Sequence, residues 1–232
     1  MTLKRFKLDM TYMYVFHDAL RRDLERIARF TAHESDNPGR VLRSAAGWEM
    51  FKKYLRIHHR AEDEAVWPVM YRLLADRPDD LALLDAMEAE HAVIDPLLDA
   101  VDAALADNEG GSRRLGDLVE SLRTNLIGHL RHEETETLAL IDATLTETQW
   151  QHFGEIQRTA IADDTRRDLP WLLDDMSTEP AEYILGVMPE PLRKAYHDQW
   201  QPAYADLDPW GTAGRPTTSG PAHSAAEPEA DR

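Results

Sequence analysis

The chain has 232 residues, of which 43% are hydrophobic. This is enough for one domain of ordinary size with extra segments, or for two small domains. The chain contains no cysteine, which excludes disulfides and cysteine-based zinc or iron–sulfur sites, so any metal must be held by nitrogen and oxygen. Its 43 acidic residues against 26 basic ones give a net charge of -17, which argues against a nucleic-acid partner and an anionic membrane surface.

No apolar run approaches the length of a membrane span. The first residues also lack the apolar block of a signal peptide. We therefore expect a cytoplasmic protein without a membrane partner.

Apolar residues recur at steps of three and four residues in four long segments, which is the pattern of helices with one buried face. Short polar connections separate these segments, and no alternating pattern typical of strands competes with them. Pro68 is expected to kink the second helix, and Ser112 is a candidate N-cap for the fourth. The sequence thus predicts an all-α, up-down-up-down four-helix bundle, with helices at Met10–His33, Val41–Ala75, Asp79–Ala106 and Arg113–Asp142.

The chain beyond the fourth helix is expected to add helices to the bundle. A fifth helix is predicted from Thr146 to Arg167, and Thr146 and Gln149 have the spacing of a capping box. Short apolar pieces between prolines then predict short helices, and a tail rich in Gly, Pro, Ser, Thr and Ala predicts disorder. The expected organisation is a bundle at 1–145, a C-terminal helical extension at 146–210 and a disordered tail at 211–232.

The role of the extension is open at this stage. It either covers one end of the bundle or forms a homodimer interface.

Four histidines lie on apolar helix faces, one in each predicted bundle helix, and two of them are followed by a glutamate four residues later. That spacing puts histidine and glutamate on one face. A single such pair is usually a surface pair, and a lone inward histidine is usually hydrogen-bonded core. The combination favours a metal site for iron, manganese or zinc, and for two metals above one. The residues are His17, His58, Glu62, His91, His129 and Glu133.

This pattern resembles the hemerythrin family, whose members carry an HHE cation-binding domain. The likeness rests on His17, His58-x-x-x-Glu62, His91 and His129-x-x-x-Glu133, with Pro68 after the first pair, and it covers about residues 10–145. It implies a non-heme di-iron centre in a hemerythrin-like bundle, with two iron ions (Fe2+/Fe3+) joined by an oxo or hydroxo bridge. By the same likeness Glu62 and Glu133 bridge the irons, and the four histidines are terminal ligands.

Two positions depart from the oxygen-carrying hemerythrins. Asp95 stands where they have a further histidine, and their usual spacing would make Glu134 the last carboxylate. Glu133 is preferred, because a residue at i+4 stays on the histidine's face.

Other residues could complete the metal shell. Asp95, His59 and Tyr54 are candidates, and for Tyr54 core packing is the favoured role. His59 and His132 are expected to face a helix boundary or solvent.

The first functional hypothesis is a di-iron protein that binds or reacts with oxygen, nitric oxide or hydrogen peroxide. Asp95 in place of a histidine favours redox chemistry, such as a peroxide-removing role in oxidative stress, or sensing over oxygen transport. The second hypothesis is an iron-binding or iron-sensing module without turnover. The third is a metal-free helical interaction protein. Whether the chain is an enzyme stays open.

Overall fold

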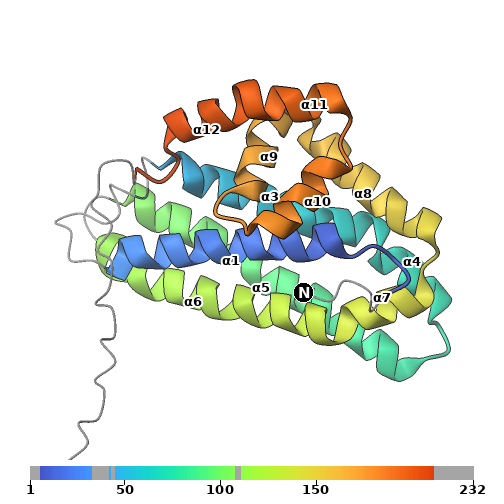
Figure 1. Cartoon of the computed structure of the whole chain (residues 1–232). Coiled ribbons are helices and arrows are strands. Elements are labelled where there is room, and N and C mark those ends of the chain that lie inside the picture. Colours follow the sequence, from blue (N-terminus) through green and yellow to red (C-terminus); the bar gives the residue numbers. More distant parts are fainter. Residues whose placement is uncertain (1–5, 33–41, 43–44, 108–110, 212–232) are drawn as a thin grey trace, which may run out of the picture.

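The computed structural model describes residues 6–32, 42, 45–107 and 111–211, and within these ranges the chain is helical without any strand. Successive helices of the bundle run in opposite directions and enclose a common core (Figure 1). This confirms the predicted all-α bundle. Its four helices are α1 (Thr11–Ala32), α3 (Ala46–Ala65), α5 (Pro78–Ala106) and α6 (Gly111–His132).

The bundle helices follow their apolar periodicity closely. In α1, Phe16, Leu20, Leu24 and Ile27 recur at three- and four-residue steps, and each is 0% exposed. Helix α5 begins with Pro78, whose missing N–H has no helical partner at that position anyway, followed by Asp79 and Asp80 in the first turn. The first and last residues of α1 and α5 each lie within one residue of the predicted helix ends. His33 lies outside the described residues.

The second predicted helix is divided in two. Helix α3 ends at Ala65, and after one intervening residue α4 (Trp67–Leu73) begins with Pro68 in its first turn. Proline is tolerated there because no hydrogen bond is lost. The expected kink at Pro68 is therefore a helix break just before it. The predicted start at Val41 is wrong, because Ala45 has an extended backbone and α3 begins only at Ala46. Val41 itself lies outside the described residues.

The fourth predicted helix continues to Thr144, but its middle is not regular. Helix α6 passes into a π-helical turn, η2 (Glu133–Thr137), and then into α7 (Leu138–Thr144). The apolar pattern did not predict this turn. The proposed N-cap at Ser112 is wrong, because α6 already begins at Gly111.

Helix α8 (Glu147–Ile161) begins with the expected capping box. Thr146 Oγ1 accepts a hydrogen bond from Gln149 N at 3.3 Å, and Gln149 Oε1 accepts one from Thr146 N at 2.9 Å. The predicted end at Arg167 is wrong, because a 3-10 turn, η3 (Ala162–Asp164), ends the helix early. This turn redirects the chain so that the next helix can place its apolar side chains on the bundle.

The remaining helices of the extension are short, as predicted. They are α9 (Thr165–Leu173), α10 (Thr178–Gly186), α11 (Glu190–Ala195), the π-helical η4 (Tyr196–Trp200) and α12 (Gln201–Leu207).

This extension covers the side of the bundle formed by α1 and α3 (Figure 1). Trp171 is 0% exposed, and its Nε1 donates a hydrogen bond to Asp23 Oδ2 at 2.6 Å. Near the end of the described chain, Pro209 O accepts a hydrogen bond from Gly47 N at 2.8 Å. The extension therefore lies along the side of the bundle, and its packing is continuous with the bundle core.

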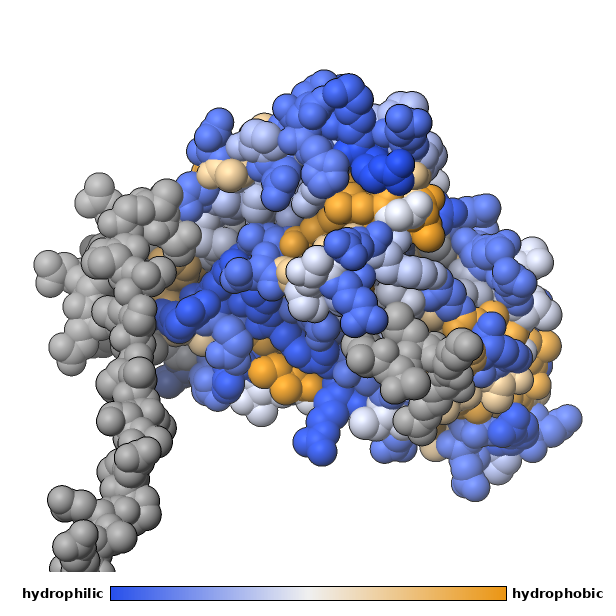
Figure 2. Space-filling view, in the orientation of Figure 1, coloured by the Kyte–Doolittle hydropathy of each residue, from blue (hydrophilic) through white to orange (hydrophobic). Residues whose placement is uncertain are grey.

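The surface is mostly hydrophilic on the face in Figure 2, with apolar side chains gathered over α10 and its junction with α11. Tyr183, Val187 and Leu192 are exposed in this region. No helix among the described residues has the length and apolarity needed to cross a lipid bilayer. The predicted disordered tail lies outside the described residues from 212 onward.

Candidate metal centre

The six residues predicted as ligands come together inside the bundle. None of them is more than 5% exposed, and Glu62, Glu133 and His17 are 0% exposed. Their donor atoms form overlapping groups in which all atoms lie within 4.8 Å of one another. One group is His17, His58 and Glu133, a second is Glu62, His129 and Glu133, and a third is His59, His91 and His129.

Two halves of the cluster can be distinguished by the imidazole contacts. In the first half, His17 Nε2 lies 3.1 Å from His58 Nε2 and 3.2 Å from Glu133 Oε2. In the second half, His91 Nε2 lies 3.2 Å from His129 Nε2. Each half therefore offers at least two imidazole nitrogens that converge on one point.

Glu62 lies between the two halves. Its Oε1 is 3.4 Å from His58 Nε2, and its Oε2 is 3.5 Å from His91 Nε2. One oxygen thus faces each half. This is the arrangement that a carboxylate needs to bridge two cations.

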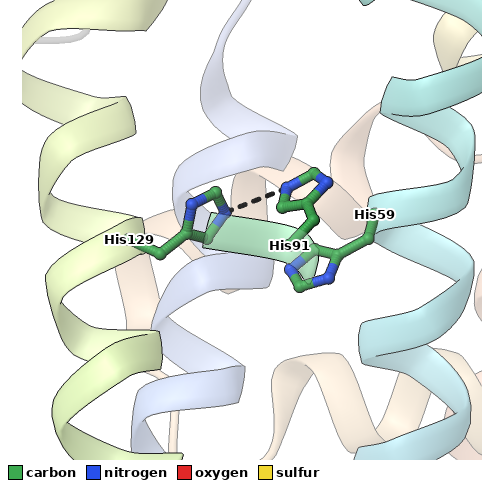
Figure 3. Close-up of side chains that lie close together, drawn as sticks. All are labelled: His59, His91 and His129. Carbon is green, nitrogen blue, oxygen red and sulfur yellow. Dashed lines mark hydrogen bonds between the residues drawn. The ribbon is translucent and has the colours of Figure 1, made fainter. Parts of the chain in front are cut away.

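His59 belongs to the second half, which the sequence analysis did not expect. It is 2% exposed, and its ring stacks on His91 with the centroids 3.9 Å apart and the planes 10° apart. Figure 3 shows the rings of His59, His91 and His129 turned toward one another from three helices. The expectation that His59 faces a boundary or solvent is wrong. Adjacent residues on a helix point about 100° apart, and here both directions lie inside the bundle, toward α1 and toward α5.

The other candidate ligands lie around this cluster. Tyr54 points away from it, because its hydroxyl donates a hydrogen bond to Asp164 Oδ2 at 2.6 Å. Asp95 has a half-exposed side chain whose Oδ1 is 4.0 Å from His59 Nδ1. Glu134 lies on the outer side of His17, where it accepts a hydrogen bond from Nδ1 at 2.9 Å. His132 is partly exposed and lies 2.8 Å from Glu90.

The outward nitrogens of the imidazoles have partners of their own. His17 Nδ1 donates to Glu134, His91 Nδ1 to Asp63 at 3.0 Å, and His129 Nδ1 to Glu90 at 2.9 Å. A carboxylate in this position fixes the ring and leaves the Nε2 lone pair free to bind a metal. For His58, the partner of Nδ1 is the amide of Gln157, 2.8 Å away.

The inner atoms of the cluster fit a pair of metal ions. Both carboxylate oxygens of Glu62 and Glu133, and both ring nitrogens of His59, are buried without a hydrogen-bond partner. Unpartnered buried polar atoms are costly, and cations would satisfy them. The donors are all nitrogen and oxygen, which suits iron, manganese or zinc.

Burial and charge act on the pKa values in this cluster. Burial, together with the charge of Glu133, raises the pKa of Glu62 well above its usual range. Burial and the neighbouring histidines lower the pKa of His58 and His59, which keeps these rings neutral. Burial alone would lower the pKa of His17, but Glu133 and Glu134 raise it. A bound cation would reverse the balance for Glu62, because it favours the ionised carboxylate.

The sequence analysis did not predict the hydrogen-bond partners of the ligands, although it considered Glu134 as a ligand. Asp63, Glu90 and Glu134 each stand next to a ligand in the chain, so acidic neighbours of the motif residues were the available signal. Gln157 had no such signal, because it comes from α8, 99 residues after His58.

Comparison with known proteins agrees with this geometry. The model of the hemerythrin HHE cation binding domain matches residues 10–141, more than half of the chain. A BRUTUS-like zinc finger protein of Arabidopsis thaliana is 21% identical over 200 residues, which are 81% of this chain and 16% of that protein. The chain therefore spans less than a fifth of this relative's length. It has no cysteine, so the similarity does not come from a cysteine-based zinc finger.

No solved structure is significantly similar to the chain. The family match covers all six predicted ligands and His59, which the structure gathers in one buried cluster. The chain belongs to the hemerythrin family of HHE cation-binding domains.

Proposed function

We propose that this chain holds a non-heme di-iron centre that binds or reacts with oxygen, nitric oxide or hydrogen peroxide. The observation that carries the proposal is the position of Glu62, with one carboxylate oxygen toward His58 and the other toward His91. Glu133 is the second shared carboxylate, because it belongs to both a His17–His58 group and a His129 group.

Each half of the cluster would hold one iron. In the first half His17 and His58 are the terminal ligands, and in the second His59, His91 and His129. His59 thus gives the second half a third imidazole, although Asp95 stands at the position where oxygen-carrying hemerythrins have their further histidine. Bound iron would supply one-electron redox chemistry and an open position for a small ligand.

The protein contributes orientation and exclusion of water. Glu134, Asp63 and Glu90 hold three imidazoles by their Nδ1 protons, so that each Nε2 points inward. The ligand side chains are almost completely buried, which favours diatomic molecules and peroxide over larger substrates.

The first test is elemental analysis of protein purified without added metal, combined with its near-ultraviolet spectrum. About two irons per chain with charge-transfer absorption is the expected result. Stoichiometric zinc or manganese would refute iron as the metal. No metal after anaerobic ferrous loading would refute the centre as a whole.

A second candidate function is iron binding or iron sensing without turnover. It is favoured by one observation, the contact between His58 and the C-terminal extension, through which iron occupancy could change the packing of α8. Rapid consumption of hydrogen peroxide or nitric oxide by the iron-loaded protein would support the first function. Stable iron binding without either reaction would support the second.

A further inference from the structure

Helix α8 lies along α3 (Figure 1), and two of its side chains contact the His58 ring. Phe153 meets the ring with centroids 6.3 Å apart at 62°, and one turn later Gln157 lies 2.8 Å from His58 Nδ1. Both α8 side chains are buried, with exposed fractions of 3% and 1%. Residues at i and i+4 share a helix face, so α8 holds the ring both by packing and by a hydrogen bond.

The partner of His58 differs in kind from the partners of the other imidazoles. His17, His91 and His129 each have a carboxylate at Nδ1, whereas His58 has a neutral amide. A carboxylate makes an imidazole a stronger electron donor than an amide does. His58 is therefore the one imidazole of the cluster whose Nδ1 is held by a neutral amide, since both ring nitrogens of His59 have no hydrogen-bond partner.

An amide also has an ability that a carboxylate lacks, because it carries both a donor and an acceptor. A metal on Nε2 requires a proton on Nδ1, and Gln157 Oε1 can accept that hydrogen bond. This oxygen is buried and has no hydrogen-bond partner in the structure. In the structure the amide nitrogen Nε2 lies 2.8 Å from Nδ1, where it can donate to an unprotonated ring. A half-turn of the amide group would bring Oε1 to a protonated Nδ1. Gln157 thus keeps a buried partner for His58 in both states.

We infer that Gln157 is a positioning residue of the metal centre, and that through it the C-terminal extension forms part of the site. This inference rests on the proposed iron centre. Gln157 lies outside the stretch that matches the family, residues 10–141. The extension thus supplies a contact that a bundle of four helices alone does not contain.

The test is a series of substitutions at this position with iron affinity measured by competition with a ferrous chelator. Gln157→Met keeps the side-chain length but has no strong donor or acceptor, whereas Gln157→Glu offers a carboxylate like those at the other imidazoles. We expect Gln157→Met to bind iron about ten- to a hundredfold more weakly. Gln157→Glu should bind at least as tightly as the wild type and have a lower reduction potential.

This order separates positioning from packing. If Gln157 only filled space, the apolar Met variant would be tolerated and the buried charge of the Glu variant would be harmful. The matched control is Gln151→Met, on the exposed face of the same helix, which should leave iron affinity and potential unchanged.

A second readout follows the extension itself. Hydrogen exchange of the α8 amides should slow when iron is added to the wild type, and this protection should be lost in Gln157→Met. Circular dichroism checks folding, and if the Met variant does not fold, the Glu variant carries the test through its affinity and potential.

Equal iron affinity in Gln157→Met and wild type would overturn the inference and leave the iron centre standing. Weaker binding by Gln157→Glu, or an unchanged potential in it, would also overturn the inference. Absence of iron in the wild type itself would overturn both the centre and the role of Gln157.

Discussion

Glu62 and Glu133 face each other inside the bundle without a hydrogen bond to any of their four carboxylate oxygens. Glu62→Gln keeps the shape of the side chain and replaces the carboxylate, which we propose bridges the two irons, by a neutral amide, which is a poor metal ligand. We expect the iron content to fall from about two ions per chain to one or none, with the helical content unchanged. Elemental analysis and circular dichroism measure the two quantities.

The matched control for this substitution is Glu64→Gln. Glu64 lies on the same helix, is exposed and pairs with Arg60 at 2.7 Å. Iron content should be unaffected by it. Full iron loading in Glu62→Gln would contradict the bridging role.

Asp168 is another buried carboxyl, far from the cluster in the chain. Burial and the charge of Asp164 raise its pKa from 3.8 to about 7. Its Oδ1 has no hydrogen-bond partner, and the residue is 6% exposed. A pKa raised on folding means that stability is fully present below about pH 4 and is lost as pH rises through about 7, by up to about 4 kcal/mol.

Asp168→Asn should therefore stabilise the fold at high pH only. The free energy of unfolding in urea should exceed that of the wild type by up to about 4 kcal/mol at about pH 8, and the gain should vanish near pH 4. Asp163→Asn, an exposed neighbour, serves as the control. A gain that does not depend on pH would contradict ionisation of Asp168 as the cause.

The sequence located the six predicted ligands in the interior because each follows the apolar period of its helix. The prediction for His59 was wrong, because the apolar periodicity of a helix indicates a single buried face. A helix in a bundle has neighbouring helices on two sides, so a residue beside that face can also be buried. Whether these residues bind metal stays a prediction. Gln157 could not be found at all, because its contact depends on how α8 docks.

At the scale of elements, periodicity and end signals located α1, α5 and the start of α8 well. The capping residues of α8 act locally, so sequence alone reveals them. The π turn η2 was missed because one extra residue in a turn hardly changes the apolar pattern on either side. The early end of α8 was missed because Ala162–Asp164 contains neither glycine nor proline.

Two helical glycines should respond to alanine in opposite directions. A Cβ at Gly47, near the start of α3, would lie 2.3 Å from the ring of Trp210, whereas one at Gly128 in α6 would meet nothing within 4 Å. Gly47→Ala should destabilise the fold by about 1–3 kcal/mol through this clash. Gly128→Ala should stabilise it by about 0.5–1 kcal/mol through helix propensity.

Thermal or urea unfolding of the two variants measures both effects. If Gly47→Ala unfolded like the wild type, the contact of Trp210 with α3 would be refuted. Gly128→Ala controls for the general effect of alanine in a helix.

At the scale of the whole molecule, the bundle and the extension share one core. Trp171, Leu172, Tyr204 and Trp210 join the cluster built by the bundle helices. A chain that ends at residue 145 would expose the faces of α1 and α3 that these side chains cover. Asp23 would also lose the hydrogen bond that it accepts from the Trp171 indole. The division at residue 145 remains a prediction about organisation and does not imply an independent folding unit.

We expect the fragment 1–145 to be aggregated or loosely folded, and to bind iron poorly. Size-exclusion chromatography, near-ultraviolet circular dichroism and iron titration compare it with the full chain. A monomeric fragment that unfolds cooperatively and binds two irons would contradict this expectation.

The shared core also orders events during synthesis on the ribosome. Translation proceeds from the N-terminus at about 5–20 residues per second, so all the inward histidines emerge before Gln157, and Trp210 emerges last of the described core. Until the extension has emerged, the bundle helices therefore lack the side chains that cover α1 and α3, and His58 lacks its hydrogen bond to Gln157. Iron insertion should accordingly follow the emergence of α8 and Trp210 and not the emergence of the four bundle helices alone.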